Sequence, residues 1–528
     1  MIGWPSAPVS DNPLLVAIDA STTSLRAMVF DVRGRVVASG RAPLRVETPE
    51  PHGYEQDADS WWQATVLAVN RAVDELPAKR HADLTTLAIA HQRETIVVTD
   101  AKGNPLGPAL LWMDSRSSAD VAYAERKLGA VRLHALSGKP ACTTPSLYKL
   151  MYLFRTHPEF RDVACVHDVH SFLSLKLTGR SVSSFASADP TGLVDMRQKR
   201  WSESLLSLIG VEPHQLPELV EVGYMIGPLT RSAAQALGMP EHVLVYAGSG
   251  DAQAAGLGAG IIGKGRGFLD LGTAVTCSTL TDTYQIDHAF RTMHAAIPGK
   301  YSLETTLRGG MQTLYWLIET LLRSPGRAAT MLELETKAAF LPVASEGLVS
   351  IPYWSGVMNP YWNDQVGGAF FGLHSGHRPE HLYRALLEGI AFEERLHLEG
   401  MEASTGRSTQ EIVLTGGGSR STLWCQIFAD VLGRPIHRAE TLDAASLGVA
   451  ILSAVAHGIY PSFEHATTEM SRLGTTFEPG PDREPFERVY RDVYRGLYRD
   501  VKTRMEALAR LRVAEGTPSP GSVRPPPE

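Results

Sequence analysis

The sequence contains few cysteines, and they are widely spaced. Among 528 residues only Cys142, Cys165, Cys277 and Cys425 occur. This spacing fits neither a disulfide-rich secreted scaffold nor a zinc motif. We therefore expect reduced, mostly buried thiols in a cytoplasmic protein.

An excess of basic charge is also lacking. The formal net charge is −7, from 50 Lys and Arg residues against 57 Asp and Glu residues. Because a broad nucleic-acid surface needs a clustered basic face, we expect no nucleic-acid partner.

Long apolar runs are missing as well. No uninterrupted run approaches the roughly 20 residues that a membrane helix needs, so we expect no membrane partner. Residues 1–13 lack the basic and apolar regions of a signal peptide and are interpreted as a short extension. Residues 513–528, rich in Pro and Gly, are interpreted as a disordered tail.

No Gly-Lys-Ser or Gly-Lys-Thr sequence is present, which argues against a P-loop kinase.

The chain is also too long for one hydrophobic core, so we expect two large α/β domains.

The first informative motif is a carboxylate followed by small hydroxyl residues. An apolar strand that begins at Leu14 delivers Asp19 into a turn, and a second apolar strand follows. The turn and the start of that strand contain Ser21, Thr22, Thr23, Ser24 and Arg26. Backbone N–H groups and hydroxyls in such a turn can surround phosphate oxygens, and a carboxylate is a hard ligand for Mg²⁺. The alternative is an ordinary β-hairpin, in which Ser and Thr are common.

The same arrangement recurs about a domain further along the chain. An apolar strand carries Asp270 into a turn of Gly272, Thr273 and Ala274, and a β-branched strand follows. Two such units indicate a duplicated architecture with a phosphate loop in each lobe. This organisation is typical of the actin-like ATPase fold, in which the nucleotide lies between two similar lobes.

Asp251 is the candidate general base. It follows Gly248-Ser249-Gly250, predicted as a turn, and precedes an alanine-rich helix near the predicted lobe boundary at 260. Its carboxylate could accept a proton from a hydroxyl that attacks phosphorus. The alternative is a helix N-cap, for which Asp is favoured.

A polar run between two apolar strands is the candidate substrate site. His91-Gln92-Arg93-Glu94 offers hydrogen-bond donors and acceptors to a polyhydric substrate, and Trp112 could form a wall of the pocket. The alternatives are a solvated ion pair and a core tryptophan.

Gly416-Gly417-Gly418 separates a short strand from a helix predicted over Ser421 to Leu432. The missing side chains would let adenine and ribose approach the backbone at a helix N-terminus. The alternative is a glycine-rich loop. Two further helices are predicted, over Tyr123 to Leu136 and Glu484 to Arg512; the second should pack its tyrosines on the second lobe.

These motifs resemble the FGGY family of carbohydrate kinases. The most specific segment is Gly368 to Glu388, GAFFGLHSGHRPEHLYRALLE, which is similar to the second signature of the family. The resemblance implies two ribonuclease-H-like lobes, residues 14–260 and 261–512, around a nucleotide cleft. It also implies transfer of the γ-phosphoryl group of ATP, with Mg²⁺, to a hydroxyl of a sugar or polyol.

The resemblance also implies residue roles. Asp251 falls on the catalytic base and Asp19 on the magnesium-associated carboxylate. The implied nucleotide contacts are Thr22, Thr23, Ser24, Arg26, Thr273, Gly310, Gly417 and Gly418.

Within the family, His91 to Arg116 is most similar to glycerol kinases. The implied substrate contacts are Arg93, Glu94, Trp112, Thr144, Asp251 and Gln253. Two positions depart from glycerol kinases: Thr144 stands in place of a tyrosine, and Ala252 in place of a glutamine, with Gln253 one residue later. Because these side chains are smaller, we expect a polyol or ketose larger than glycerol.

The alternatives are a xylulose- or ribulose-type pentulokinase, or a nucleotide-switched interaction protein of the actin or heat-shock chaperone kind. Arg93, Glu94 and Asp251 together favour a kinase over the interaction protein. A homodimer is the expected assembly.

Overall fold

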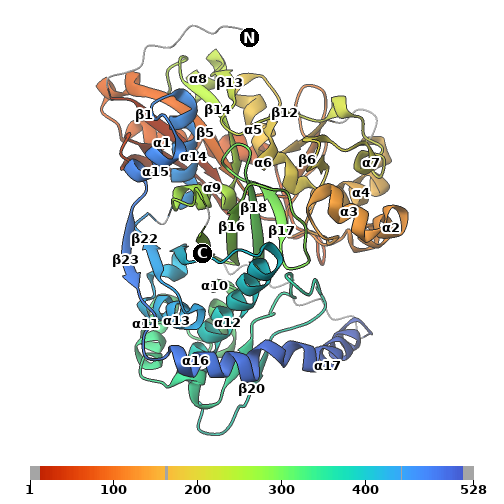
Figure 1. Ribbon diagram of the computed structural model, residues 1–528. Helices are drawn as coiled ribbons and strands as arrows, with labels where there is room; N and C mark the ends of the chain where they lie inside the picture. The colour runs from red at the N-terminus through yellow and green to blue at the C-terminus, as the bar shows by residue number, and fades with distance from the viewer. Residues whose placement is uncertain (1–11, 161–164, 264, 442, 515–528) are drawn as a thin grey trace.

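The computed structural model describes residues 12–160, 165–263, 265–441 and 443–514. The predicted extension and tail therefore lie almost wholly outside the described residues. Two large sheets dominate the molecule, one in each half of the chain (Figure 1).

The first sheet grows from the hairpin that carries Asp19. Its six strands lie in the order β13-β14-β5-β1-β2-β3, with bounds Met225–Pro228, Leu244–Gly250, Leu84–His91, Leu14–Ala20, Ser24–Phe30 and Val36–Pro43. β1, β2 and β3 form an antiparallel meander, and β1, β5 and β14 run parallel. All seven residues of β1 are buried because helices cover both faces of the sheet.

The second sheet repeats this plan. Its seven strands lie in the order β17-β18-β16-β15-β21-β22-β23, with bounds Arg291–His294, Tyr301–Leu307, Val275–Thr281, Arg266–Leu271, Glu411–Thr415, Ile436–Ala439 and Leu473–Phe477. Apart from the extra edge strand β17, each strand has a counterpart in the first sheet with the same direction. Asp19 and Asp270 are each the penultimate residue of the first meander strand. The predicted duplication is confirmed.

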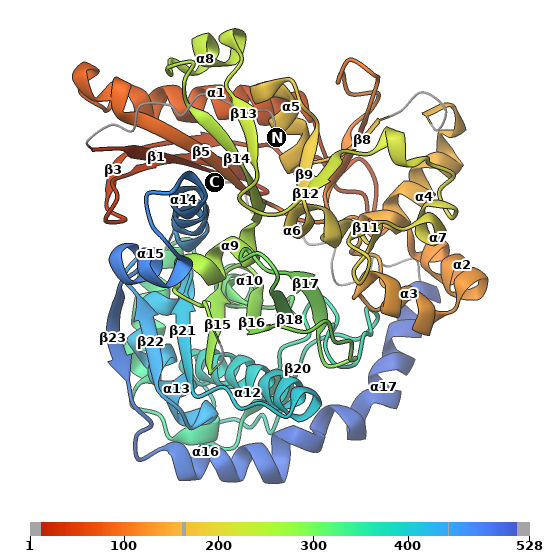
Figure 2. The same cartoon turned by 45° about the horizontal axis from the view of Figure 1, so that its top comes forward.

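One helix crosses between the two halves of the chain. α14 (Ala444–His457) comes after the second meander in sequence, but it packs on β1 and β5 of the first sheet and on α9 (Asp251–Gly258). Figures 1 and 2 show α14 beside the first sheet. A Cβ atom on Gly448 would overlap the carbonyl oxygen of Ala254, so glycine allows this close contact. The boundary predicted at residue 260 therefore separates the sheets but not all of their helices.

A smaller subdomain is inserted in the first half. Its sheet has the order β4-β7-β6-β8, with bounds Glu55–Gln56, Ala109–Leu110, Ile96–Thr99 and Cys165–Asp168. α4 (Ser146–Thr156) contributes Leu147, Leu150 and Phe154 to its core.

Two predictions of local structure are wrong. The helix predicted over Tyr123 to Leu136 is two helices, α2 (Ser118–Leu128) and α3 (Ala130–Ser137), because Gly129 adopts φ 84° between them. The turn predicted at Gly248-Ser249-Gly250 is the end of β14, where a Cβ atom on Gly248 would clash with the Ile89 carbonyl oxygen of β5.

The long C-terminal helix is present but has an irregular turn. It consists of α16 (Arg483–Val489), a π-helical turn over Tyr490–Tyr494 and α17 (Arg495–Ala514). Tyr490, Tyr494 and Tyr498 are buried in the core of the second lobe, which confirms the predicted packing of this face.

Candidate active site

A cavity of about 760 Å³ lies between the two sheets and draws its lining from both. Of the predicted site residues, it is lined by Asp19, Thr22, Arg26, Arg93, Glu94, Trp112, Thr144, Asp251, Thr273 and Gly417. In the described part of the chain, the predicted residues outside this lining are Thr23, Ser24, Gln253, Gly310 and Gly418. Residues from each predicted group, for phosphate, for substrate and for the base, therefore converge on one cavity.

The first hydroxyl-rich turn is tightly organised around Asp19. The Ser21 hydroxyl donates to both carboxylate oxygens of Asp19 at 2.9 Å. Burial, together with the negative charge of Asp251, raises the pKa of Asp19 to about 6. The indole Nε1 of Trp112 donates to the Thr22 hydroxyl at 3.0 Å, so Trp112 supports this turn as well as lining the cavity.

Arg26 joins this turn to the crossing helix. Its guanidinium is paired with Asp443, directly before α14, and both side chains line the cavity.

The second turn has a matching carboxylate. The Thr415 hydroxyl donates to Asp270 at 3.0 Å, and burial raises the pKa of Asp270 to about 6. Gly310 lies directly behind this turn: the N–H of Met311 donates to the Gly272 carbonyl at 3.0 Å, and a Cβ atom on Gly310 would lie 2.7 Å from that oxygen.

The glycine triplet differs from its prediction. Gly417 lines the cavity, but Gly417–Arg420 form a 3₁₀ turn, and α13 (Thr422–Leu432) begins later with Ser421 as its N-cap. The Ser421 hydroxyl accepts from the Trp424 N–H at 3.0 Å. The triplet is therefore not the helix N-terminus.

The carboxylates at the two turns suit a divalent cation that binds together with a nucleotide. Among the described residues, no group of three or more His, Cys, Asp or Glu side chains could hold a metal ion. Mg²⁺ is commonly bound by one or two carboxylates together with phosphate oxygens and water. Asp19 and Asp270, with buried carboxylates at the two turns, fit that pattern.

Asp251 occupies the first position of α9, one residue after the N-cap Gly250, so the N-cap interpretation is wrong. Its side chain is 40% exposed and lines the cavity. Its carboxylate accepts from the Ala252 N–H at 2.8 Å and lies 3.3 Å from the Arg93 Nε.

The Arg93-Glu94 pair is not the solvated ion pair of the alternative interpretation. Arg93 pairs with Glu304 at 2.7 Å, and Glu94 pairs with Arg291 at 2.8 Å. Gln253 lies behind the pair, where its side-chain oxygen accepts from Arg93 at 3.4 Å. Thr144 lines the cavity and its hydroxyl accepts from Arg308 at 3.4 Å.

Sequence reasoning missed Glu304, Arg291, Arg308 and Asp443. Glu304 had one available signal, because it is a charged residue inside an otherwise apolar and polar-uncharged strand, YSLETTL.

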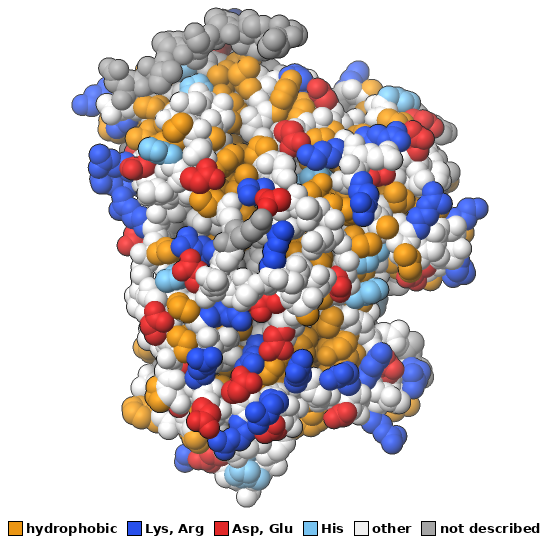
Figure 3. Space-filling model, viewed as in Figure 1, with side chains coloured by type: hydrophobic (Ala, Val, Ile, Leu, Met, Phe, Trp, Pro, Cys, Tyr) orange, Lys and Arg blue, Asp and Glu red, His pale blue; other side chains and the backbone are white. Residues whose placement is uncertain are grey.

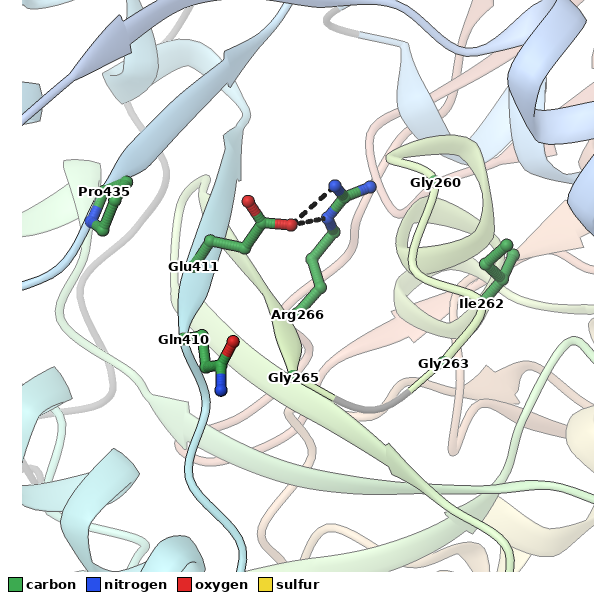
Figure 4. A pocket seen from close by; sticks show the side chains of 8 residues that line it. All are labelled: Gly260, Ile262, Gly263, Gly265, Arg266, Gln410, Glu411 and Pro435. Atoms are coloured by element: carbon green, nitrogen blue, oxygen red, sulfur yellow. Dashed lines mark hydrogen bonds and ion pairs between the residues drawn. The ribbon is translucent and has the colours of Figure 1, made fainter.

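A second cavity, of about 520 Å³, lies at the glycine-rich connection between the halves of the chain (Figure 4). Figure 4 shows Arg266 paired with Glu411 on one side and Gly260 to Gly263 on the other. Ten of the predicted site residues line the first cavity, and none is among the residues that line this one.

The charged side chains on one face of the molecule are of mixed sign. Figure 3 shows Lys and Arg side chains interspersed with Asp and Glu on the face it presents. Within the described residues, no helix has both the length and the apolar character to span a membrane.

Two duplicated lobes, each with a carboxylate at a hydroxyl-lined turn, and a third carboxylate in the cavity between them define the class: a phosphotransferase of the actin-like ATPase fold. Residues 14–258 match the N-terminal domain of the FGGY family of carbohydrate kinases, and residues 268–457 match its C-terminal domain. The chain belongs to this family, whose members are phosphotransferases that act on hydroxyl groups.

Individual relatives cover almost the whole chain. It is 29% identical over 503 residues to the xylulose kinase of Escherichia coli, covering 92% of this chain and 99% of that protein. It is 27% identical over 488 residues to the glycerol kinase of Thermococcus gammatolerans, covering 90% of this chain and 95% of that protein. The crystal structure of xylulose kinase from Rhodospirillum rubrum matches with a TM-score of 0.85 at 27% identity, covering 93% of this chain and 99% of that one.

Proposed function

We propose that this protein transfers the γ-phosphoryl group of ATP to a hydroxyl of a ketose or polyol larger than glycerol. The observation that carries the proposal is the single cavity that brings Asp251 and the Arg93-Glu94 pair together with both hydroxyl-rich turns. An acceptor held by Arg93 and Glu94 would lie beside a candidate base and face the phosphate turns.

In this mechanism the Asp251 carboxylate accepts the proton of the acceptor hydroxyl. The hydroxyl oxygen forms a bond to the γ-phosphorus, and the bond from that phosphorus to the bridging oxygen of ADP breaks. Thr22 and Thr273 bind phosphate oxygens, and Asp19 and Asp270 are the carboxylates that would hold the metal ion. When bound, Mg²⁺ neutralises charge on the phosphates. Closure of the lobes excludes water as a competing acceptor.

Two features support an acceptor larger than glycerol. Thr144 and Ala252, the small residues at the two departures from glycerol kinases, both line the cavity. Several relatives are named xylulose kinases, which supports a five-carbon ketose as the first candidate.

The test is ADP release in a coupled assay with glycerol, erythritol, xylulose, ribulose and gluconate as separate acceptors. We expect kcat/KM to be higher for a pentulose than for glycerol. Equal or better turnover of glycerol would contradict the size argument, and ADP release independent of any acceptor would contradict the kinase proposal.

A further inference from the structure

Four charged side chains from the two lobes form one buried network beside the acceptor end of the cavity. Arg93 and Glu94 follow β5 of the first lobe, whereas Arg291 lies in β17 and Glu304 in β18 of the second. Their side chains are 7%, 5%, 5% and 1% exposed, respectively. Charges this deeply buried are costly unless each is paired, so the arrangement of the network is tightly constrained.

The two charged residues of the second lobe, Arg291 and Glu304, pair with each other. Arg291 and Glu304 face each other across the antiparallel pair β17 and β18. The guanidinium of Arg291 donates to one oxygen of Glu304 twice, from Nε at 2.9 Å and from Nη2 at 2.6 Å. Figure 2 shows β17 and β18 next to α6 (Phe185–Ala188) of the first half of the chain.

The two charged residues of the first lobe, Arg93 and Glu94, are arranged differently from those of the second. Within the described residues, no ion pair joins Arg93 to Glu94. Instead, Arg93 donates across the lobes to Glu304 at 2.7 Å, and Glu94 accepts across the lobes from Arg291 at 2.8 Å. The orientations of Arg93 and Glu94 therefore depend in part on residues of the other lobe.

The backbone conformation of Glu94 also indicates that its orientation depends on contacts such as the one with Arg291. Glu94 has φ 56°, in the left-handed region that side-chain-bearing residues rarely adopt. Such a conformation persists only where the surroundings hold it, and the ion pair with Arg291 is one contact that does so. The guanidinium groups of Arg93 and Arg291 overcome the effect of burial and lower the pKa of Glu304 below its usual value.

Arg93 also connects Glu304 to the reacting end of the cavity. Its Nε lies 3.3 Å from Asp251 while its Nη1 is bound to Glu304. If Glu304 lost its charge, the Arg93 guanidinium would be free to turn toward the nearest carboxylate, Asp251. The acceptor would then meet a differently placed arginine.

We propose that Arg291 and Glu304 are positioning residues for the acceptor, so that the acceptor site is complete only when the two lobes are in contact. The role of Arg93 and Glu94 as acceptor ligands rests on the proposed function; the coupling to the second lobe goes beyond it. The nucleotide turns at Thr22 and Thr273 lie outside this network, so nucleotide binding does not depend on it.

The test compares Glu304→Gln and Glu304→Asp with the wild-type protein. Glu304→Gln should raise the KM for the best acceptor by about 10- to 100-fold, the range expected for losing a hydrogen bond to a charged group. The KM for ATP should stay within about twofold, and Glu304→Asp should recover part of the loss because it keeps the charge. A purely structural defect would raise both KM values or neither.

Glu402→Gln is the matched control. Glu402 belongs to the second lobe and pairs with Arg434 at 2.6 Å in a partly buried site away from the cavity. The Glu402→Gln variant should have the wild-type KM for the acceptor and for ATP. If Glu304→Gln does not fold, the double variant Arg291→Gln/Glu304→Gln removes both charges together and is expected to raise the acceptor KM in the same way.

Two outcomes would overturn the inference: an acceptor KM within twofold of wild type in a Glu304 variant that still binds ATP, or equal rises in the KM for acceptor and for ATP. Failure of the wild-type protein to phosphorylate any acceptor would instead count against the proposed function, since the Glu304 comparison begins from an active enzyme.

Discussion

At the scale of single residues, the two buried carboxylates at the turns make stability depend on pH. The pKa values of Asp19 and Asp270 are raised from 3.8 to about 6, chiefly because burial disfavours the charge. Between these values the folded state holds more protons than the unfolded state. The contribution of each group to the free energy of unfolding therefore falls as pH rises from 3.8 to about 6.

We expect Asp19→Asn to stabilise the nucleotide-free protein at pH 8, with a rise in Tm of about 1 °C for each kcal/mol of relieved desolvation in a chain of this length. The difference should shrink toward pH 4, where Asp19 itself is neutral. Thermal unfolding from pH 4 to pH 8 measures this; a Tm difference that does not change with pH would contradict the burial argument.

The role of Asp251 is tested by Asp251→Asn. Because the amide cannot take up the acceptor proton, kcat should fall by about 10²- to 10⁴-fold while nucleotide binding is retained. The measurements are coupled ADP release and a nucleotide titration. Asp59→Asn is the control, since Asp59 is likewise the first residue of a helix, α1 (Asp59–Asp74), but this helix packs on β2 and β3 and Asp59 is not among the residues that line the cavity. Substantial turnover by Asp251→Asn would remove Asp251 from its role.

Thr144 lines the cavity, and we expect it to limit the size of the acceptor. Thr144→Tyr places a ring in the cavity, so kcat/KM for a pentulose should fall by about tenfold or more, while glycerol is affected less. Coupled assays with both acceptors measure the ratio. A fall of the same size for both acceptors would show that Thr144 does not discriminate by size.

At the scale of elements, the contact between α9 and α14 holds Asp251 in place. A Cβ atom at Gly448 would overlap the Ala254 carbonyl oxygen, so Gly448→Ala must push the helices apart. We expect a loss of about 1–3 kcal/mol in the free energy of unfolding, together with a lower kcat. Chemical denaturation and coupled assays measure the two effects.

Gly256→Ala is the matched control for that change. Gly256 lies in α9, the helix against which Gly448 of α14 packs, and a Cβ atom there would have no neighbour within 4 Å among the described residues. Replacement by alanine should therefore be neutral or stabilise the protein by up to about 1 kcal/mol. If Gly448→Ala is as benign as Gly256→Ala, the helices do not depend on this close contact.

Individual elements differ in how far the sequence predicts them. The hairpins of Asp19 and Asp270 are predictable because an apolar strand, a turn and a second strand are all local patterns. The break at Gly129 and the extension of β14 through Gly250 depend on what packs against each segment. Local pattern does not carry that information.

At the scale of the whole molecule, the residues that join the lobes are the least predictable. Arg93 and Glu94 are visible as a polar run between strands, but their partners Glu304 and Arg291 lie about 200 residues away and meet them only in the folded chain. The packing of α14 on the first sheet is unpredictable for a similar reason, because its apolar pattern would suit burial against either sheet. The duplicated plan is predictable, whereas the contacts between its two copies are not.

The most direct test of the central claim is mass spectrometry of the acceptor after incubation with ATP and Mg²⁺, with ADP release followed in parallel. The account predicts one phosphoryl group on a pentulose or larger polyol, formed in step with ADP by the wild-type protein and not by Asp251→Asn. Release of ADP without any phosphorylated acceptor, at the same rate in both proteins, would contradict it.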